Sequence, residues 1–243
     1  MAPLRTDPPA REGATLLLFD VDGTLLAGAA NAHAQALWAA LHDVHGIDAT
    51  RVRSAVSPAG RTDGEIARML LLAAGVSAAR IDERADDVRA ACCERYAKLC
   101  PPDLSDKVIP GIPALLEQLS ERDDIVLSLV TGNFEPVGRL KLSRAGIGGF
   151  FAPDQGAFGS DAEDRAMLPG IARRRAGFNG TAFPRKRTIV IGDTPRDIFC
   201  ARADDVGYIA VTTGPYDAAQ LSEADAVASD PAQLGDLLSA PVG

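Results

Sequence analysis

The sequence lacks long apolar runs, cysteines at metal-binding spacings and an excess of positive charge. No apolar run approaches the ~20 residues that span a bilayer, so a membrane partner is not expected. The 33 acidic residues outnumber the 25 lysines and arginines, and the net charge of −8 argues against nucleic acid or an anionic membrane as a partner. The cysteines are expected to be buried, reduced thiols, at Cys92, Cys93, Cys100 and Cys200.

Aromatic residues are also scarce, at 5%, whereas hydrophobic residues make up 47%. This composition is typical of a helix-rich globular protein, and 243 residues suit one large domain or a domain with a modest insertion. Residues 1–14 carry three prolines and mixed charges without an apolar stretch, which predicts a flexible N-terminal tail rather than a secretory signal. The cytoplasm is the expected compartment.

A buried strand is predicted directly after this tail. Its apolar residues, Leu16 to Phe19, do not alternate with polar ones, which is typical of a parallel strand covered by helices on both faces. Asp20 and Asp22 follow at a spacing that lets both side chains leave the strand end toward one crevice. An unpaired ionised carboxylate there would cost several kcal/mol, so a cation or hydrogen-bond donors must lie beside the two aspartates.

From Val108 onward, strand patterns alternate with helix patterns, which predicts an α/β fold with a doubly wound, Rossmann-like parallel sheet. Further strands are expected at Ile125–Val130, Phe150–Phe158 (a weak edge strand), Thr188–Ile191, Tyr208–Thr212 and Ala226–Ala228. Helices are expected at Gly111–Ser120, at Phe134–Ala145, from a capping box at Ser160–Glu163 to about Ala176, and from Thr194-Pro195 onward.

Between the first strand and Val108 the periodicity is helical. Three helices are expected, at His33–Val44, at Thr62–Gly75 after a capping box of Thr62 and Glu65, and at Ala78–Leu99. The pattern therefore predicts an inserted all-helical domain over residues 28–106. The core domain would be discontinuous, with residues 15–27 and 107–243.

Polar residues end three of the predicted strands, at Asp20, Thr131 and Asp193. Because parallel strands connected by right-handed crossovers point the same way, all three ends should face one crevice. The strands that end at Thr131 and Asp193 lead into helix N-termini, whose N–H donors suit a phosphate group.

The segment Asp20-Val21-Asp22-Gly23-Thr24 resembles the first motif of the haloacid dehalogenase superfamily, whose members mostly hydrolyse phosphate esters through an aspartyl-phosphate. Thr131-Gly132-Asn133 resembles the second motif, and Gly192-Asp193-Thr194-Pro195-Arg196-Asp197 resembles the fourth. Thr194 and Asp197 also fit a helix cap. The resemblance covers Thr15 to Thr213 and implies an inserted helical cap of the C1 type, as in relatives of phosphoglycolate phosphatase.

The resemblance implies roles for the residues at these positions. Asp20 would attack phosphorus, and Asp22 would act as general acid and base. Phosphate oxygens would be bound by the motif that contains Thr131, Gly132 and Asn133. A phosphate monoester repels carboxylates, so a hard cation is needed, and Mg²⁺ suits oxygen ligands. The implied metal ligands are Asp20, the backbone carbonyl of Asp22, and Asp193, with Asp197 as a supporting carboxylate.

The third motif departs from the family pattern, because no lysine precedes a helix in a Lys-Pro context between Phe150 and Thr188. Arg165 stands at about the expected place, and Lys141 is the alternative. Arg61, in a segment that resembles the specificity loop of the cap, is either a contact for an acidic substrate group or a surface arginine.

Other candidate residues are interpreted as structural. His42 and His45 lie three residues apart without a third metal ligand, so these two histidines and His33 are expected to be solvated. The basic clusters at residues 173–175 and 185–187 are expected to be solvated faces.

These features predict a Mg²⁺-dependent phosphatase for a small phosphorylated metabolite, with a monomer or homodimer as the expected assembly. A dehalogenase is disfavoured, because such relatives lack the second carboxylate, here Asp22. A phosphomutase of the β-phosphoglucomutase type and a non-catalytic phosphate-binding relative remain the alternatives.

Overall fold

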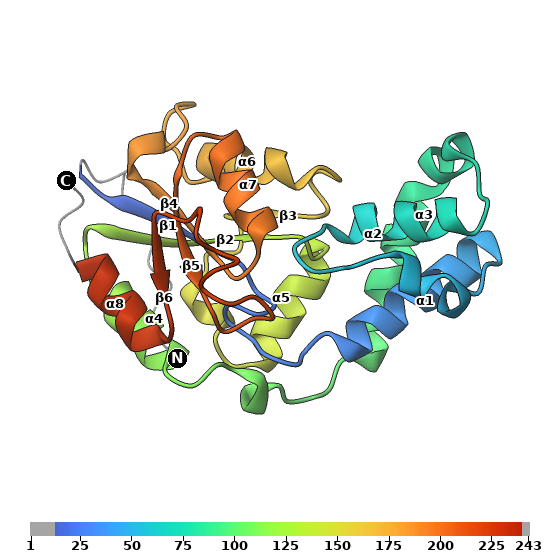
Figure 1. The fold of residues 1–243 in the computed structure, drawn as a ribbon, viewed down its shortest axis with the longest axis horizontal. Coiled ribbons are helices and arrows are strands. Elements are labelled where there is room, and N and C mark those ends of the chain that lie inside the picture. The colour runs from blue at the N-terminus through green and yellow to red at the C-terminus, as the bar shows by residue number, and fades with distance from the viewer. Residues whose placement is uncertain (1–12, 240–243) are drawn as a thin grey trace.

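The central feature of the fold is a six-stranded parallel sheet with the order β3-β2-β1-β4-β5-β6 (Figure 1). A computed structural model describes residues 13–239, so the predicted tail lies outside the described residues except for Gly13 and Ala14. The strands are β1 (Thr15–Phe19), β2 (Ile125–Thr131), β3 (Ala157–Phe158), β4 (Thr188–Gly192), β5 (Gly207–Val211) and β6 (Ala226–Ala228). The predicted α/β fold is therefore confirmed.

Strand β1 lies between β2 and β4 and is buried on both faces. Leu16 to Phe19 are each 0% exposed. Leu17 and Phe19 belong to the apolar cluster on one face of the sheet, whereas Leu16 and Leu18 belong to the cluster on the other face. This double burial explains the absence of alternation in the sequence. Truncating one of these leucines to Ala should cost ~2–5 kcal/mol of unfolding free energy.

Helices cover both faces of the sheet. One apolar cluster contains residues of α4 (Ile112–Ser120), α5 (Glu135–Arg144) and α8 (Pro231–Ser239). The opposite cluster contains residues of α6 (Leu168–Arg175) and α7 (Pro195–Ala203). Because the strands are parallel and α4 to α7 lie in the connections between them, the strand ends that precede α5 and α7 lie at the same edge of the sheet.

Three further helices form a separate group with its own apolar core: α1 (Asn31–His45), α2 (Asp63–Ala73) and α3 (Ala78–Leu99). Figure 1 shows this group to one side of the sheet. Phe134 and Val137, which follow β2, join its core. The backbone N–H of Asp63 donates to the carbonyl of Gly132 at 2.8 Å, so the start of α2 is attached to the carboxyl end of β2. The division of the chain into domains stays a prediction.

Several details differ from the sequence-based predictions. The helix predicted from Ser160 does not begin there, because the chain first forms a short 3-10 turn, η5 (Arg165–Met167), and α6 begins at Leu168. The edge strand β3 has only two residues. Arg173 is not solvated: it is 5% exposed, and its Nε donates to Asp204 Oδ2 at 2.6 Å.

The four cysteines are free, as predicted, although only Cys92 and Cys200 are buried and the other two are half-buried. Between residues 13 and 239, no helix is long and apolar enough to cross a bilayer.

Candidate active site

The first two candidate residues, Asp20 and Asp22, lie where β1 ends in a tight turn. The N–H of Asp20 still donates to Ile191 of β4 at 2.9 Å, so Asp20 makes the last ladder contact of the strand. The N–H groups of Leu25 and Leu26 then donate back to the carbonyl of Val21 at 3.0 and 2.9 Å. Asp22 therefore leaves from within a turn.

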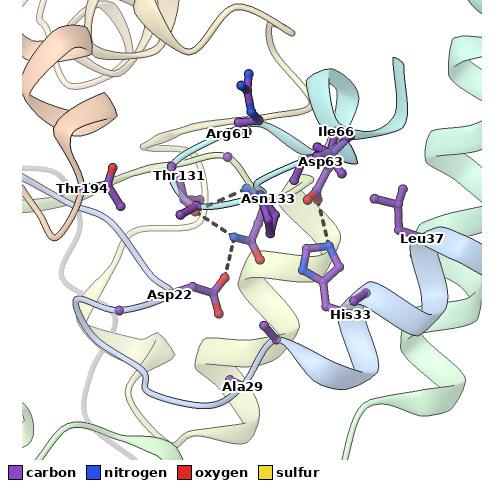
Figure 2. Close-up of a pocket in the computed structure, with 18 of the residues that line it drawn as sticks. Asp22, Ala29, His33, Leu37, Arg61, Asp63, Ile66, Thr131, Asn133 and Thr194 are labelled. Carbon is purple, nitrogen blue, oxygen red and sulfur yellow. Dashed lines mark hydrogen bonds and ion pairs between the residues drawn. The ribbon is translucent and has the colours of Figure 1, made fainter. Parts of the chain in front are cut away.

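Side chains from β2 and β4 meet this turn at one cavity of about 540 Å³. Asp20, Thr131 and Asp193, which end three neighbouring strands, all line it. Figure 2 shows Asp22, Thr131 and Asn133 close together in this cavity. The expectation that the three strand ends face one crevice is correct.

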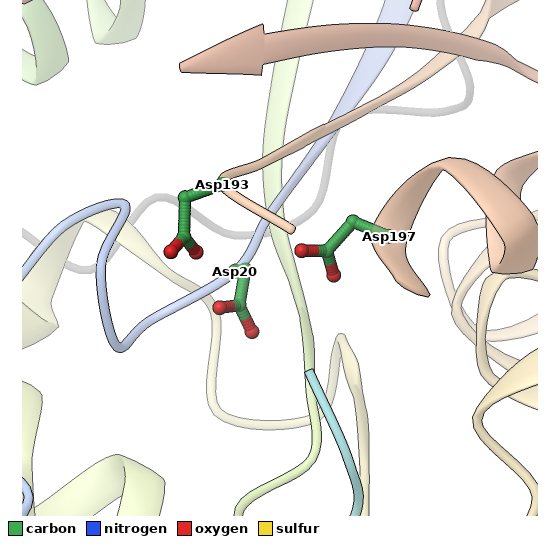
Figure 3. A group of neighbouring side chains, drawn as sticks. All are labelled: Asp20, Asp193 and Asp197. Carbon is green, nitrogen blue, oxygen red and sulfur yellow. The ribbon is translucent and has the colours of Figure 1, made fainter. Parts of the chain in front are cut away.

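A cluster of buried carboxylates lies at one end of the cavity, where Asp20 and Asp193 line it. Single oxygens of Asp20, Asp193 and Asp197 lie within 4.8 Å of one another (Figure 3). Burial, with the charges of neighbouring aspartates, raises the pKa of Asp193 to about 8. Burial also raises the pKa of Asp20 to about 7, although the Arg165 cation opposes this effect. Three carboxylates held this close favour a cation among them.

The donor set fits the predicted Mg²⁺, because hard carboxylate oxygens are the ligands that this ion prefers. The hydroxyl of Thr24 donates to Asp193 Oδ1 at 3.3 Å. Two glycines crowd its carboxylate: a Cβ at Gly23 would lie 2.2 Å from Oδ2, and one at Gly214 would lie 1.7 Å from the same atom. A side chain at either glycine would therefore clash with the Asp193 carboxylate.

Asp197 fits a supporting role better than that of a direct ligand. Its Oδ2 accepts from the N–H and the hydroxyl of Thr194, at 3.0 and 2.7 Å, as part of a complete capping box at the start of α7. Its Oδ1 accepts from Arg165. Both carboxylate oxygens therefore already have partners within the protein. Asp20 and Asp193 remain the residues best suited to hold a metal ion.

Arg165 is the cation beside the carboxylate cluster. It is 7% exposed, and its Nη2 donates to Asp20 Oδ1 at 3.0 Å and also to Asp197. Its Nε is buried without a partner among residues 13–239, which leaves a donor for a ligand. The carboxylate of Asp164 caps η5 by accepting from Ala166 N at 2.9 Å, and this turn positions Arg165.

Lys141 reaches the other aspartate of the first motif. It lies in α5 and is 0% exposed, and its Nζ donates to Asp22 Oδ2 at 2.6 Å. The side-chain amide of Asn133 donates to the same oxygen at 2.9 Å. Burial would raise the pKa of Asp22, but the charge of Lys141, with these hydrogen bonds, holds it below its usual value. Asp22 Oδ1 is buried without a partner in the described part of the chain.

His33 was expected to be solvated, and this prediction is wrong. It is 8% exposed, and its Nδ1 lies 3.2 Å from Lys141 Nζ. An ammonium group can only donate, so Nδ1 accepts, and Nε2–H is free to donate to Asp63 Oδ2 at 3.0 Å. The same Asp63 oxygen accepts from the N–H of Phe134 at 2.7 Å. The network connects α1 and α2 with Asp22.

No sequence signal identified His33 and Asp63 as partners. They lie 30 residues apart on two different helices. The only local hint is that each is the first cavity-lining residue of its helix. Residues 33, 34, 37 and 38 of α1 and residues 63, 66 and 70 of α2 line the cavity at helical spacing.

The helix N-termini offer fewer free donors than predicted. At the start of α5, Phe134 N donates to Asp63, and Glu135 N donates to the hydroxyl of Ser160 at 2.8 Å. At the start of α7, Thr194 N is held by the capping box. Phosphate would therefore depend mainly on side chains such as Thr131 and Arg165, because these backbone donors are already used.

Arg61 lines the cavity but is not free. Its Nη1 pairs with Glu65 one helical turn away, and its Nε donates to the carbonyl of Ser57 at 3.0 Å. The predicted capping box is only half formed, because Thr62 accepts from Glu65 N at 3.1 Å while the Glu65 carboxylate pairs with Arg61. Gly132 allows this segment to approach, since a Cβ there would lie 2.0 Å from the carbonyl oxygen of Arg61.

Comparison with known proteins identifies the family. The sequence model of the haloacid dehalogenase-like hydrolase family matches residues 17–202, which is most of the chain. The chain belongs to this family of hydrolases. A search of curated proteins found no significant match.

Solved structures share the fold at low sequence identity. A hydrolase from Pseudomonas syringae is 24% identical with a TM-score of 0.65, over 92% of this chain and 97% of that chain. A predicted phosphoglycolate phosphatase from Haemophilus somnus 129pt is 19% identical with a TM-score of 0.63, over 93% and 99%. β-Phosphoglucomutase from Clostridium difficile is 18% identical with a TM-score of 0.62, over 91% and 93%.

Proposed function

We propose that this protein is a Mg²⁺-dependent phosphatase that hydrolyses a phosphate monoester through an aspartyl-phosphate on Asp20. The observation that supports this best is the position of the Asp20 carboxylate. It lies in the cavity among Asp193, Asp197 and Arg165, at the point where three strands end. A nucleophilic carboxylate needs nearby positive charge to approach an anionic phosphate, and this corner can hold two cations.

Fixed donors would stabilise the charge that develops on the phosphoryl oxygens. The hydroxyl of Thr131 and the unpartnered Nε–H of Arg165 are the donors we assign to this task. Mg²⁺ held by Asp20 and Asp193 would supply Lewis-acid polarisation of the phosphoryl group and would neutralise part of its charge.

Asp22 is the candidate acid and base. Its low pKa suits the second half of the reaction, in which a carboxylate takes a proton from the water that attacks the aspartyl-phosphate. Protonation of the leaving oxygen in the first half needs the neutral carboxyl group. We therefore propose that the Lys141–Asp22 contact at 2.6 Å loosens when substrate binds.

We also propose that residues 28–106 form a cap that selects the substrate. Helices α1 and α2 line the cavity opposite the strand ends, and they have their own core. The link through Asp63 and Gly132 lies where such a cap would contact the core.

Release of inorganic phosphate from a panel of monoesters, with and without Mg²⁺, tests the proposal. Asp20→Asn should abolish phosphate release while leaving the melting temperature close to that of the parent. Asp204→Asn is a matched control, because Asp204 also pairs with a buried arginine, Arg173, but does not line the cavity. Full activity in Asp20→Asn would contradict the proposal. Isomerisation of a sugar phosphate without phosphate release would favour the phosphomutase alternative.

A further inference from the structure

One end of the cavity is lined by charged residues, and the rest is lined mostly by apolar residues. On α1, His33 faces the charged end and Leu37 lies one turn further along. On α2, Asp63 is followed by Ile66 and Leu70 on the same helical face. Figure 2 shows Leu37 and Ile66 on the side of the cavity away from Asp22. Leu70 lies seven positions after Asp63, which is about 10 Å along the helix, so an apolar compartment about two turns long adjoins the charged end.

The other residues around this compartment are also mostly apolar. Those that line the cavity beyond its charged end include Ala34, Leu37, Trp38, Val56, Ile66 and Leu70.

Few polar groups are available in the compartment. Arg61 is committed to Glu65 and to a backbone carbonyl. Arg53 and Ser54 also line the cavity, but on its solvent-exposed side, where the Arg53 guanidinium lies 5.5 Å from the centre of the Trp38 ring. A sugar or a short hydroxy acid would lose water from its hydroxyl groups here without gaining matching partners, which disfavours binding.

We propose that the substrate is a phosphate monoester of an apolar alcohol whose hydrocarbon part lies between α1 and α2. This inference rests on the proposed phosphatase function. The reaction would break the bond between phosphorus and the ester oxygen, and water would supply the replacing oxygen, so the products are the apolar alcohol and inorganic phosphate. The cavity of about 540 Å³ is far larger than a two-carbon phosphate requires and lies within the range for ligands with sizeable apolar parts.

A series of n-alkyl phosphates tests the proposal on the unmodified protein with Mg²⁺. From methyl to butyl to hexyl phosphate, kcat/KM should rise about two- to fourfold for each added methylene, as expected for burial of hydrocarbon. Hexyl phosphate should also be a better substrate than phosphoglycolate or glucose 6-phosphate. A flat or falling series, with a polar ester preferred, would overturn the inference and leave the phosphatase proposal standing.

A matched pair of variants tests where the hydrocarbon lies. Ala34 lines the cavity, whereas Ala39, on the same helix and similarly half-buried, does not. Ala34→Asn should lower the ratio of kcat/KM for hexyl over methyl phosphate at least fivefold, and Ala39→Asn should leave that ratio unchanged. Equal ratios in the two variants would overturn the proposed placement.

Binding can be measured separately from turnover, because the chain has a single tryptophan and Trp38 lines the cavity. In Asp20→Asn with Mg²⁺, hexyl phosphate should change the Trp38 emission at concentrations at least tenfold lower than methyl phosphate. Such binding without phosphate release from any ester by the unmodified protein would refute the phosphatase proposal while supporting an apolar site. Equal affinity for the two esters would overturn the inference.

Discussion

Mg²⁺ should stabilise this protein more at pH 8 than at pH 6. Burial raises the pKa of Asp20 to about 7 and that of Asp193 to about 8, against 3.8 for an unperturbed aspartate. In the metal-free folded state these groups hold protons that the unfolded chain has already released. Unfolding free energy therefore falls as the pH rises from the unfolded pKa through the folded values.

The size of this loss follows from the two pKa values. A group that keeps its proton only in the folded state lowers the unfolding free energy by about 1.4 kcal/mol per pH unit. With folded pKa values of about 7 and about 8, the two aspartates together should remove on the order of 3 kcal/mol between pH 6 and pH 8. For a chain of this size that corresponds to roughly 6–12 °C in Tm.

Thermal unfolding with a chelator and with saturating Mg²⁺, at both pH values, measures the effect. The metal-free Tm should fall between pH 6 and pH 8, and the Mg²⁺-induced rise should be larger at pH 8, where protons no longer compete for the carboxylates. Asp193→Asn should reduce the fall in metal-free Tm between pH 6 and pH 8 and should remove the rise in Tm on addition of Mg²⁺. Asp204→Asn should preserve both changes in Tm. A metal-free Tm that is unchanged at pH 8, or a Mg²⁺ effect independent of pH, would refute the reasoning.

Three further substitutions test individual contacts of the site. Lys141→Met removes the ammonium beside Asp22, so the pKa of that carboxyl should rise and the acid limb of the pH–rate profile should move to higher pH; an unmoved limb would contradict the assignment. Arg165→Met leaves two buried carboxylates without their counter-charge and should cost ~3–5 kcal/mol of metal-free unfolding free energy in a denaturant titration, with Arg165→Lys costing less. Gly214→Ala places a carbon 1.7 Å from Asp193 Oδ2 and should weaken Mg²⁺ binding at least tenfold by calorimetry.

Much of the fold was predictable because local patterns and burial agree. The unbroken apolar run of β1 predicts burial on two faces, and Leu16 to Phe19 are buried there. The start of α7 was equally predictable, since the capping residue Thr194, Pro195 and Asp197 lie within four residues. Such features depend on residues that are close together in the sequence, so the sequence alone is enough to predict them.

The missed features depend on contacts between distant segments. The Ser160 pattern predicts a helix start, but its hydroxyl instead accepts from Glu135, and the helix begins eight residues later at Leu168. His33 has the neighbours of an ordinary helix residue, yet Asp63 and Lys141, from two other helices, surround it. The sequence offers Arg165 and Lys141 as alternatives for one position, whereas in the structure they contact Asp20 and Asp22 respectively.

Chemical trapping of the intermediate tests the central proposal most directly. Protein quenched during turnover with Mg²⁺ and a phosphate monoester can be treated with borohydride, which reduces an acyl phosphate to an alcohol, and then digested for peptide mass spectrometry. An aspartyl-phosphate on Asp20 predicts homoserine at position 20 in a substrate-dependent amount, and none at Asp193 or Asp197. Steady phosphate release with an unmodified Asp20 peptide under the same quench would contradict it.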